Sequence, residues 1–332
     1  MAREVHIELG INGAFITRRW ERPGNWMRLT REMGFRNHEF CADVLDPFFS
    51  GDPDYQMETA RQVRSEAQRY GVTITDIYTG VATHRFHGLS HSHPAARQRM
   101  KQWILDCCDI ALAMGTDRVG GHWDAIPVEV MEDERAYQSA VGRVQSIFRE
   151  LSRAAARKGI GALYEEQMYI PSEVPWTLQQ AEEFMLAVNR DNDQGCPVYL
   201  TLDVGHQAGM HYGLEGQDLD YVAWCRRFGA VAEIVHLQQT TPDASAHWAF
   251  TEELNELGHV QIPPILEALE QAHRQFEDSR FAEVMAPVDH IYLIAEIIPG
   301  STKTEEKLLD ELRQSSEYLH QFVPEEGMVL EI

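Results

Sequence analysis

Residues 198–206 read VYLTLDVGH, a short apolar run that ends in an aspartate and a histidine. Runs of this length, rich in β-branched, leucine and aromatic residues and bounded by proline and glycine, are typical of a buried β-strand. Amphipathic patterns of helical length lie on either side of it, at 178–188 and 219–228. Because a strand between two helices is the repeating unit of a parallel sheet, this part of the chain predicts an α/β protein.

The same alternation runs through the whole chain. The expected strands are residues 5–9, 35–40, 72–79, 117–122, 160–166, 198–203, 232–237 and 291–296. The expected helices include residues 55–70, 95–114, 134–158, 178–188, 219–228, 262–273 and 305–322. Eight strands that alternate with helices are typical of a closed parallel barrel, so we expect a (β/α)8 TIM barrel. The 332 residues then form a single domain, 1–332, with an irregular insertion at about 239–260 between strands seven and eight.

Composition narrows the partners and the location of the chain. Lys and Arg number 29 and Asp and Glu number 52, which gives a net charge of −23. Nucleic acids and anionic membranes require clustered basic residues, so neither is an expected partner. The five cysteines form no CxxC pair, and the first residues lack a signal-peptide core. Both features favour a cytoplasmic protein with reduced thiols.

Polar side chains end four consecutive expected strands. They are Glu166, Asp203, His236 and Glu296, at the ends of strands five, six, seven and eight. Active sites of (β/α)8 barrels lie at the carboxyl ends of the strands, so we expect these side chains to converge. Carboxylates in such apolar strands are costly unless a cation offsets their charge. Three oxygen ligands and one imidazole best suit one Mn²⁺ or Mg²⁺ ion, with Co²⁺ or Zn²⁺ as alternatives.

The fifth strand offers two adjacent glutamates, and strand alternation helps to choose between them. Glu166 shares a face with Tyr164 and Ala162, the polar and aromatic mixture also found beside the other strand-end carboxylates. Glu165 shares its face with Leu163, an aliphatic residue expected to point toward the helices. We therefore predict Glu166 as the ligand and keep Glu165 as the alternative.

With these residues the chain resembles the xylose-isomerase-like barrels, the group that contains ketose 3-epimerases and AP endonucleases. The resemblance is carried by LDVGH at 202–206, His236 and the two strand-end glutamates. Ketose 3-epimerases of this group hold one divalent metal with Glu, Asp, His and Glu. The implied ligands are Glu166, Asp203, His236 and Glu296. The resemblance also implies that Glu166 and Glu296 are the catalytic pair that removes and returns a proton through an enediolate, and that His206 binds the substrate.

Several local segments resemble a narrower branch, the tetrulose-phosphate enzymes typified by D-erythrulose 1-phosphate 3-epimerases. They are EQMY at 166–169, HLQQT at 236–240, HWAFT at 247–251 and GLSH at 88–91. The branch implies a ketose phosphate of tetrulose type as the substrate.

Two departures from related enzymes bear on the substrate. Xylose isomerase itself has a second metal held by aspartates soon after the strand-seven histidine, whereas LQQT follows here at 237–240. A two-metal aldose isomerase is therefore disfavoured. Ketose epimerases usually carry a substrate-contacting arginine in this region, where this chain offers Gln238, Gln239 and Thr241. We take Gln238 as a candidate substrate-binding residue.

Further candidates lie in the loops at the same end of the barrel. Lys303 belongs to GSTKT at 300–304, which either cradles a phosphate with backbone N–H groups or is a plain Ser/Thr helix cap. His122 ends strand four and either contacts the substrate or packs in the core. HRFH at 84–87 either covers the substrate or is solvated.

The leading hypothesis is a metal-dependent ketose 3-epimerase. The same site would perform one-metal aldose–ketose isomerisation if the proton returned to the adjacent carbon. A metal-dependent phosphodiesterase like the AP endonucleases is disfavoured, because it needs a basic groove and the chain carries −23. From the resemblance we also expect a homo-oligomer, either a dimer or a tetramer.

Overall fold

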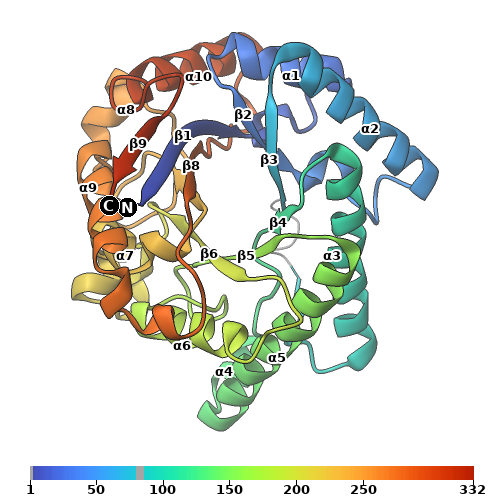
Figure 1. Ribbon diagram of the computed structural model, residues 1–332, viewed down its shortest axis with the longest axis vertical. Coiled ribbons are helices and arrows are strands. Elements are labelled where there is room, and N and C mark those ends of the chain that lie inside the picture. The colour runs from blue at the N-terminus through green and yellow to red at the C-terminus, as the bar shows by residue number, and fades with distance from the viewer. Residues whose placement is uncertain (1–2, 80–85) are drawn as a thin grey trace.

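The computed structural model describes residues 3–79 and 86–332. Its parallel strands are β1 (Glu4–Asn12), β2 (Asn37–Cys41), β3 (Thr73–Tyr78), β4 (Arg118–Gly120), β5 (Ala162–Glu166), β6 (Val198–Asp203), β7 (Ile234–Leu237) and β8 (His290–Ala295). Each strand pairs with the next in chain order, and β1 pairs with both β2 and β8. The sheet is therefore closed, and the predicted (β/α)8 barrel is confirmed (Figure 1).

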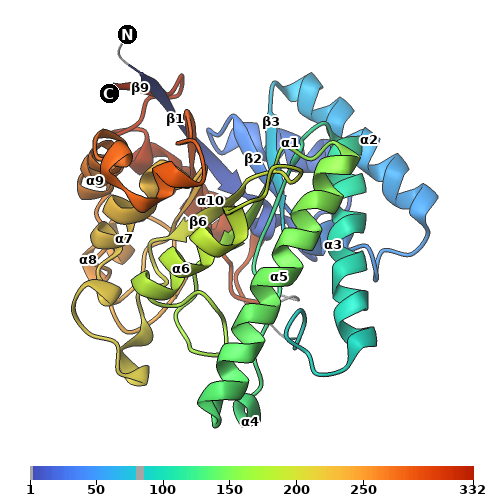
Figure 2. The ribbon, with the colours of Figure 1, turned by 60° about the horizontal axis from the view of Figure 1, so that its bottom comes forward.

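Helices surround the barrel on its outside (Figures 1 and 2). They are α1 (Pro23–Glu32), α2 (Pro53–Tyr70), α3 (Pro94–Met114), α4 (Val128–Met131), α5 (Glu134–Lys158), α6 (Leu178–Asn189), α7 (Tyr221–Phe228), α8 (Glu252–Leu257), α9 (Ile262–Arg274) and α10 (Glu305–Leu319). Local signals set several of these ends. Asp52 and Thr177 accept backbone N–H bonds at the starts of α2 and α6, and Gly159 ends α5 in the left-handed conformation.

Three details differ from the expected pattern. The fourth strand stops at Gly120, because Gly121 takes a φ of +138° and turns the chain out of the sheet. A further strand, β9 (Met328–Glu331), pairs antiparallel with the start of β1 (Figure 2). The segment at 239–260 contains α8 and an isolated bridge between Gln239 and Trp248, so part of it is regular.

Alternation along the strands separates the barrel interior from the layer beneath the helices. Ala162, Tyr164, Ile234 and Ile294 form a small buried cluster of their own within the barrel. Leu163, from the other face of β5, belongs to the large core shared with the helices. Glu166 has the same parity as Ala162 and Tyr164, so its side chain continues the interior face at the carboxyl end of β5.

None of the helices in the described ranges is both long enough and apolar enough to cross a membrane.

The turn at Gly121 gives a test of the fold. A Cβ at this residue would lie 1.5 Å from Thr79 Oγ1 and 2.5 Å from Thr79 Cβ, and the φ of +138° is itself unfavourable for other residues. We expect Gly121→Ala to lower the free energy of unfolding by at least about 2 kcal/mol in urea denaturation. The control is Gly142→Ala within α5, where a Cβ meets nothing within 4 Å. That change should raise stability by about 0.5–1 kcal/mol, and equal stability of the two variants would contradict the geometry.

Candidate metal centre

Four side chains meet at the carboxyl end of the barrel. Glu166, Asp203, His236 and Glu296 each offer one ligand atom, and these atoms all lie within 4.8 Å of one another. The strand register explains why these side chains lie close together, because Asp203 on β6 is directly beside His236 on β7. Glu166 and Glu296 come from the ends of β5 and β8 on either side of this pair. All four side chains are buried.

The imidazole of His236 points one nitrogen at the three carboxylates. Its Nδ1 lies 3.1 Å from Glu166 Oε1, 3.3 Å from Glu296 Oε2 and 3.8 Å from Asp203 Oδ2. Glu296 Oε2 is buried and completes no hydrogen bond with any residue in the described ranges. Three carboxylates, one of them with a buried oxygen that lacks a hydrogen-bond partner, and one imidazole nitrogen fit a divalent cation.

The charged groups of the cluster shift one another's pKa values. Burial raises the pKa of the Asp203 carboxyl to about 6. Burial alone would also raise the pKa of Glu296, but His236 and His247 hold it well below its ordinary value. Although burial opposes its charged form, Glu296 and Glu39 raise the pKa of His236 well above the ordinary value. Without a cation, a protonated His236 is thus the charge that offsets the surrounding carboxylates.

Glu39 contacts His236 at the ring nitrogen that does not face the cluster, and this contact was not predicted from the sequence. His236 Nε2 lies 3.0 Å and 3.1 Å from the two oxygens of Glu39, and Asn12 Nδ2 donates to the same carboxylate at 2.5 Å. This contact places the Nε2 proton toward Glu39 and leaves Nδ1 for the cluster, the arrangement often found behind metal-binding histidines. The available signal was a glutamate inside the buried run NHEFC of β2, at 37–41.

The two glutamates of β5 have different surroundings. Glu165 faces away from the cluster and lies 3.0 Å from His122 Nδ1, and both side chains are buried. Burial raises the pKa of Glu165 to about 7. Although burial alone would lower it, Glu165 raises the pKa of His122 to about 9. The structure therefore brings Glu166, and not Glu165, into the cluster.

Beside the cluster lies a cavity of about 440 Å³. Its wall includes Glu166, Glu296, His206, His247, Tyr169 and Asn12. His206 Nδ1 lies 2.8 Å from the carbonyl oxygen of Gln167, so this nitrogen carries a proton and donates it. The Nε2 atom is then the part of the ring available to a ligand in the cavity.

The chain matches the family described as Xylose isomerase-like TIM barrel over residues 27–284. The chain belongs to this family. A curated relative of the chain is the D-erythrulose 1-phosphate 3-epimerase of Brucella abortus (strain 2308). It is 22% identical over 267 residues, which cover 79% of this chain and 83% of the relative.

Several solved structures share the fold. A Rhodospirillum rubrum protein, provisionally named a xylose isomerase, superposes with a TM-score of 0.79 at 22% identity, covering 96% of this chain and 100% of the other. The D-psicose 3-epimerase of Clostridium cellulolyticum H10 gives a TM-score of 0.66 at 18% identity, covering 95% of this chain and 98% of the other. At these identities the likeness establishes the barrel architecture alone.

Three of the predicted substrate-binding residues do not reach the cavity wall. Gln238 is fully buried and donates to both carboxylate oxygens of Asp203 at 2.9 Å and 3.1 Å. It therefore holds the Asp203 side chain in position. His122 is fully buried against Glu165, on the face opposite to the cluster. Lys303 is paired with Glu311 of α10, and the helix-cap alternative for its segment is the one observed, since Thr304 accepts the N–H of Lys307. Of the four predictions, only His206 lines the cavity.

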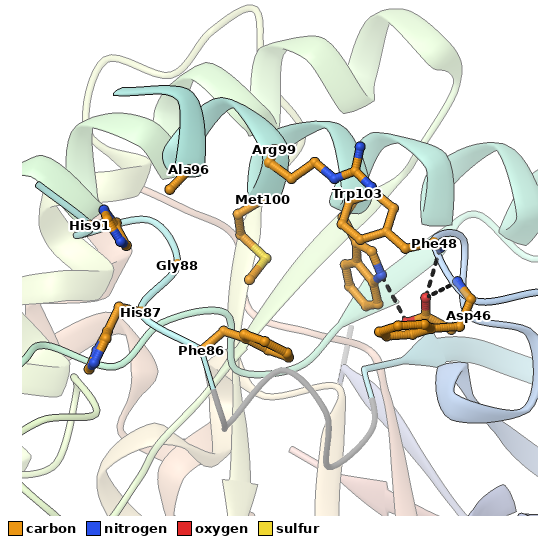
Figure 3. Close-up of a pocket in the computed structure, with 11 residues that line it drawn as sticks. Asp46, Phe48, Phe86, His87, Gly88, His91, Ala96, Arg99, Met100 and Trp103 are labelled. Carbon is orange, nitrogen blue, oxygen red and sulfur yellow. Dashed lines mark hydrogen bonds between the residues drawn. The ribbon is translucent and has the colours of Figure 1, made fainter. Parts of the chain in front are cut away.

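A second cavity of about 460 Å³ lies between the β2–α2 and β3–α3 connections (Figure 3). Its wall is mainly apolar, with Trp103, Met100 and Phe86, and the Arg99 guanidinium lies 3.8 Å from the ring centre of Phe48. Among the described residues of its wall, the buried carboxylate is Asp46, which already accepts from Trp103 Nε1 and from two backbone N–H groups. The described part of this wall therefore offers no free carboxylate for catalysis.

The loop segment at 84–87, with its two histidines, lies only partly within the described residues. His84 and Arg85 lie outside the described residues. His87 lines the second cavity, and its Nδ1 lies 2.6 Å from the carbonyl oxygen of Ala125. The structure thus gives His87 a backbone partner away from the metal cluster.

Proposed function

We propose that the protein is a divalent-metal-dependent ketose 3-epimerase. The observation that carries the proposal is the presence of two glutamates, Glu166 and Glu296, in one buried cluster that opens onto a cavity. Inversion of a carbon beside a carbonyl needs one group to remove a proton and another to supply one on the other face. Two carboxylates at one site are suited to these two tasks.

The four residues of the cluster would hold the metal ion, with Mn²⁺ as the first choice and Mg²⁺, Co²⁺ or Zn²⁺ as alternatives. A bound divalent cation would polarise the ketose carbonyl and so make the C3 hydrogen more acidic. One glutamate takes that proton as a carboxylate, which leaves a planar enediolate. The other glutamate, protonated at that moment, returns a proton to the opposite face and inverts C3. After the inversion the two glutamates have exchanged protonation states, and proton exchange with the solvent restores them before the next turnover in the same direction.

Polar groups of the wall would orient the substrate. Asn12, Tyr169 and His206 present polar side chains at the cavity. A polyhydroxylated chain offers both donors and acceptors to such groups, and held in one orientation it presents a single C–H bond to the base. The likeness to the Brucella abortus enzyme supports a tetrulose phosphate as the substrate.

The proposal is tested by isotope exchange. The protein is incubated with Mn²⁺ in D₂O with D-erythrulose 1-phosphate, and in parallel with D-psicose, D-tagatose and D-fructose. We expect deuterium at C3 together with the C3 epimer, followed by NMR, because the proton removed by one glutamate exchanges before another is returned.

Two other outcomes have clear meanings. Label at C1 with formation of an aldose would replace the proposal with aldose–ketose isomerisation. Absence of exchange with every sugar tested, in protein shown to contain metal, would refute both activities.

A further inference from the structure

The cavity contains a histidine to which the sequence assigns no role. His247 lies between β7 and α8 and lines the cavity with Ser245, His206 and Glu296. Its Nδ1 is 3.3 Å from Glu296 Oε2, yet neither atom completes a hydrogen bond with a residue of the described chain. Two buried polar atoms that lack hydrogen bonds in this way can both be satisfied by a group that accepts and donates. A hydroxyl has this property.

The backbone at His247 is held in an uncommon conformation. Its φ is +47°, in the left-handed region that residues other than glycine and asparagine seldom adopt. Two contacts fix it: the His247 N–H donates to Gln238 Oε1 at 2.7 Å, and Gln239 and Trp248 exchange backbone hydrogen bonds beside it. Conformations of this kind persist where the surroundings over-determine them, and they are concentrated at functional sites.

A chain of hydrogen bonds also fixes the position of the ring. The Gln238 amide donates to Asp203 and, at 3.0 Å, to Ser245 Oγ. Ser245 Oγ in turn lies 3.1 Å from His247 Nε2 and 3.4 Å from Gln238 Oε1. His247 Nδ1 lies beside a carboxylate oxygen of Glu296, which can only accept, so Nδ1 carries a proton whether or not Nε2 is protonated as well.

We propose that His247 is a substrate-binding residue whose Nδ1–H donates to a hydroxyl oxygen of a polyhydroxy ketone held next to Glu296. The chain from Asp203 through Gln238 and Ser245 positions it. The inference rests on the proposed epimerase function and adds one residue to it. The group recognised is a sugar hydroxyl, since a hydroxyl can accept from Nδ1 and also donate to the carboxylate.

The test uses two variants that both tolerate the left-handed backbone. His247→Gly removes the ring without strain, and His247→Asn keeps a short amide donor. Binding is measured by calorimetry on the Mn²⁺-loaded protein, with the pre-equilibrated C3 epimers of whichever sugar the wild type exchanges fastest. We expect about tenfold weaker binding and a similar rise in KM for His247→Gly, as for loss of one buried hydrogen bond. His247→Asn should recover much of this loss.

Mn²⁺ affinity, measured by titration of the metal alone, separates substrate binding from a role at the metal. We expect it to change by less than about twofold in both variants, a change too small to count as loss of a ligand. The matched control is His211→Ala, an exposed histidine outside the cavity wall, which should match the wild type. Unchanged sugar binding in His247→Gly, or an equal loss of Mn²⁺ affinity, would overturn the inference. A wild type that exchanges none of the sugars would instead refute the proposed function itself.

Discussion

Replacement of Glu296 or Glu166 by glutamine should reduce epimerisation by at least about 10³-fold, because each change removes both a proton carrier and an anionic oxygen from the cluster. Glutamine has nearly the same shape as glutamate, so the buried packing is retained. The measurement is the rate of C3 epimer formation with saturating Mn²⁺, together with the metal content of each variant. Metal content distinguishes a lost base from a lost ligand.

The control for this experiment is one residue away. Glu165→Gln makes the same change on the same strand, but Glu165 lies 3.0 Å from His122 Nδ1, outside the cluster. Glutamine can keep that contact, so we expect activity within about tenfold of the wild type. Full activity in Glu166→Gln with loss in Glu165→Gln would show that the other member of the pair is the working one.

Removal of the metal should abolish activity and lower the melting temperature. Without a cation, three carboxylates share a buried space with His236 and repel one another. A ligand at 100 times its Kd stabilises the folded state by about 2.7 kcal/mol, so Mn²⁺ should raise the melting temperature by several degrees over chelator-treated protein. Readdition of Mn²⁺ should restore both activity and stability.

Two variants make the thermal experiment specific. In Asp203→Asn, one anionic ligand is lost, so the rise caused by Mn²⁺ should largely disappear. In Gly142→Ala, which lies on a helix outside the cluster, the rise should equal that of the wild type. Equal melting temperatures with and without Mn²⁺ in the wild type would contradict a metal site at these residues.

Features that depend on local pattern could be predicted from the sequence. The eight barrel strands and their order follow from alternating apolar runs and helical periodicity, and helix α5 has the predicted ends, Glu134–Lys158. The polar residues at the strand ends were visible because parallel strands of one barrel must bring their carboxyl ends together. The single domain at 1–332, the cytoplasmic location and the dimer or tetramer stay predictions.

Features that depend on distant contacts could not be predicted. Glu39 contacts His236, which lies 197 residues later in the sequence, and no local pattern predicts this contact. The placement of His247 depends on a left-handed backbone fixed by Gln238, which has no signature in the surrounding residues. Gln238 was predicted to bind the substrate, whereas in the structure its amide donates to Asp203. Strand position alone does not reveal whether a side chain reaches the cavity or contacts another residue.

The carboxylates around His236 have a thermodynamic consequence for the whole molecule. Without a cation, protons offset part of the carboxylate charge, because the pKa of Asp203 is raised to about 6 by burial and that of His236 is raised well above its ordinary value by Glu296 and Glu39. The proposed cation would displace these protons, so its binding would release acid and acidification would weaken its binding. Under the proposed function, metal occupancy at the mouth of the barrel would therefore depend on the pH of the surroundings.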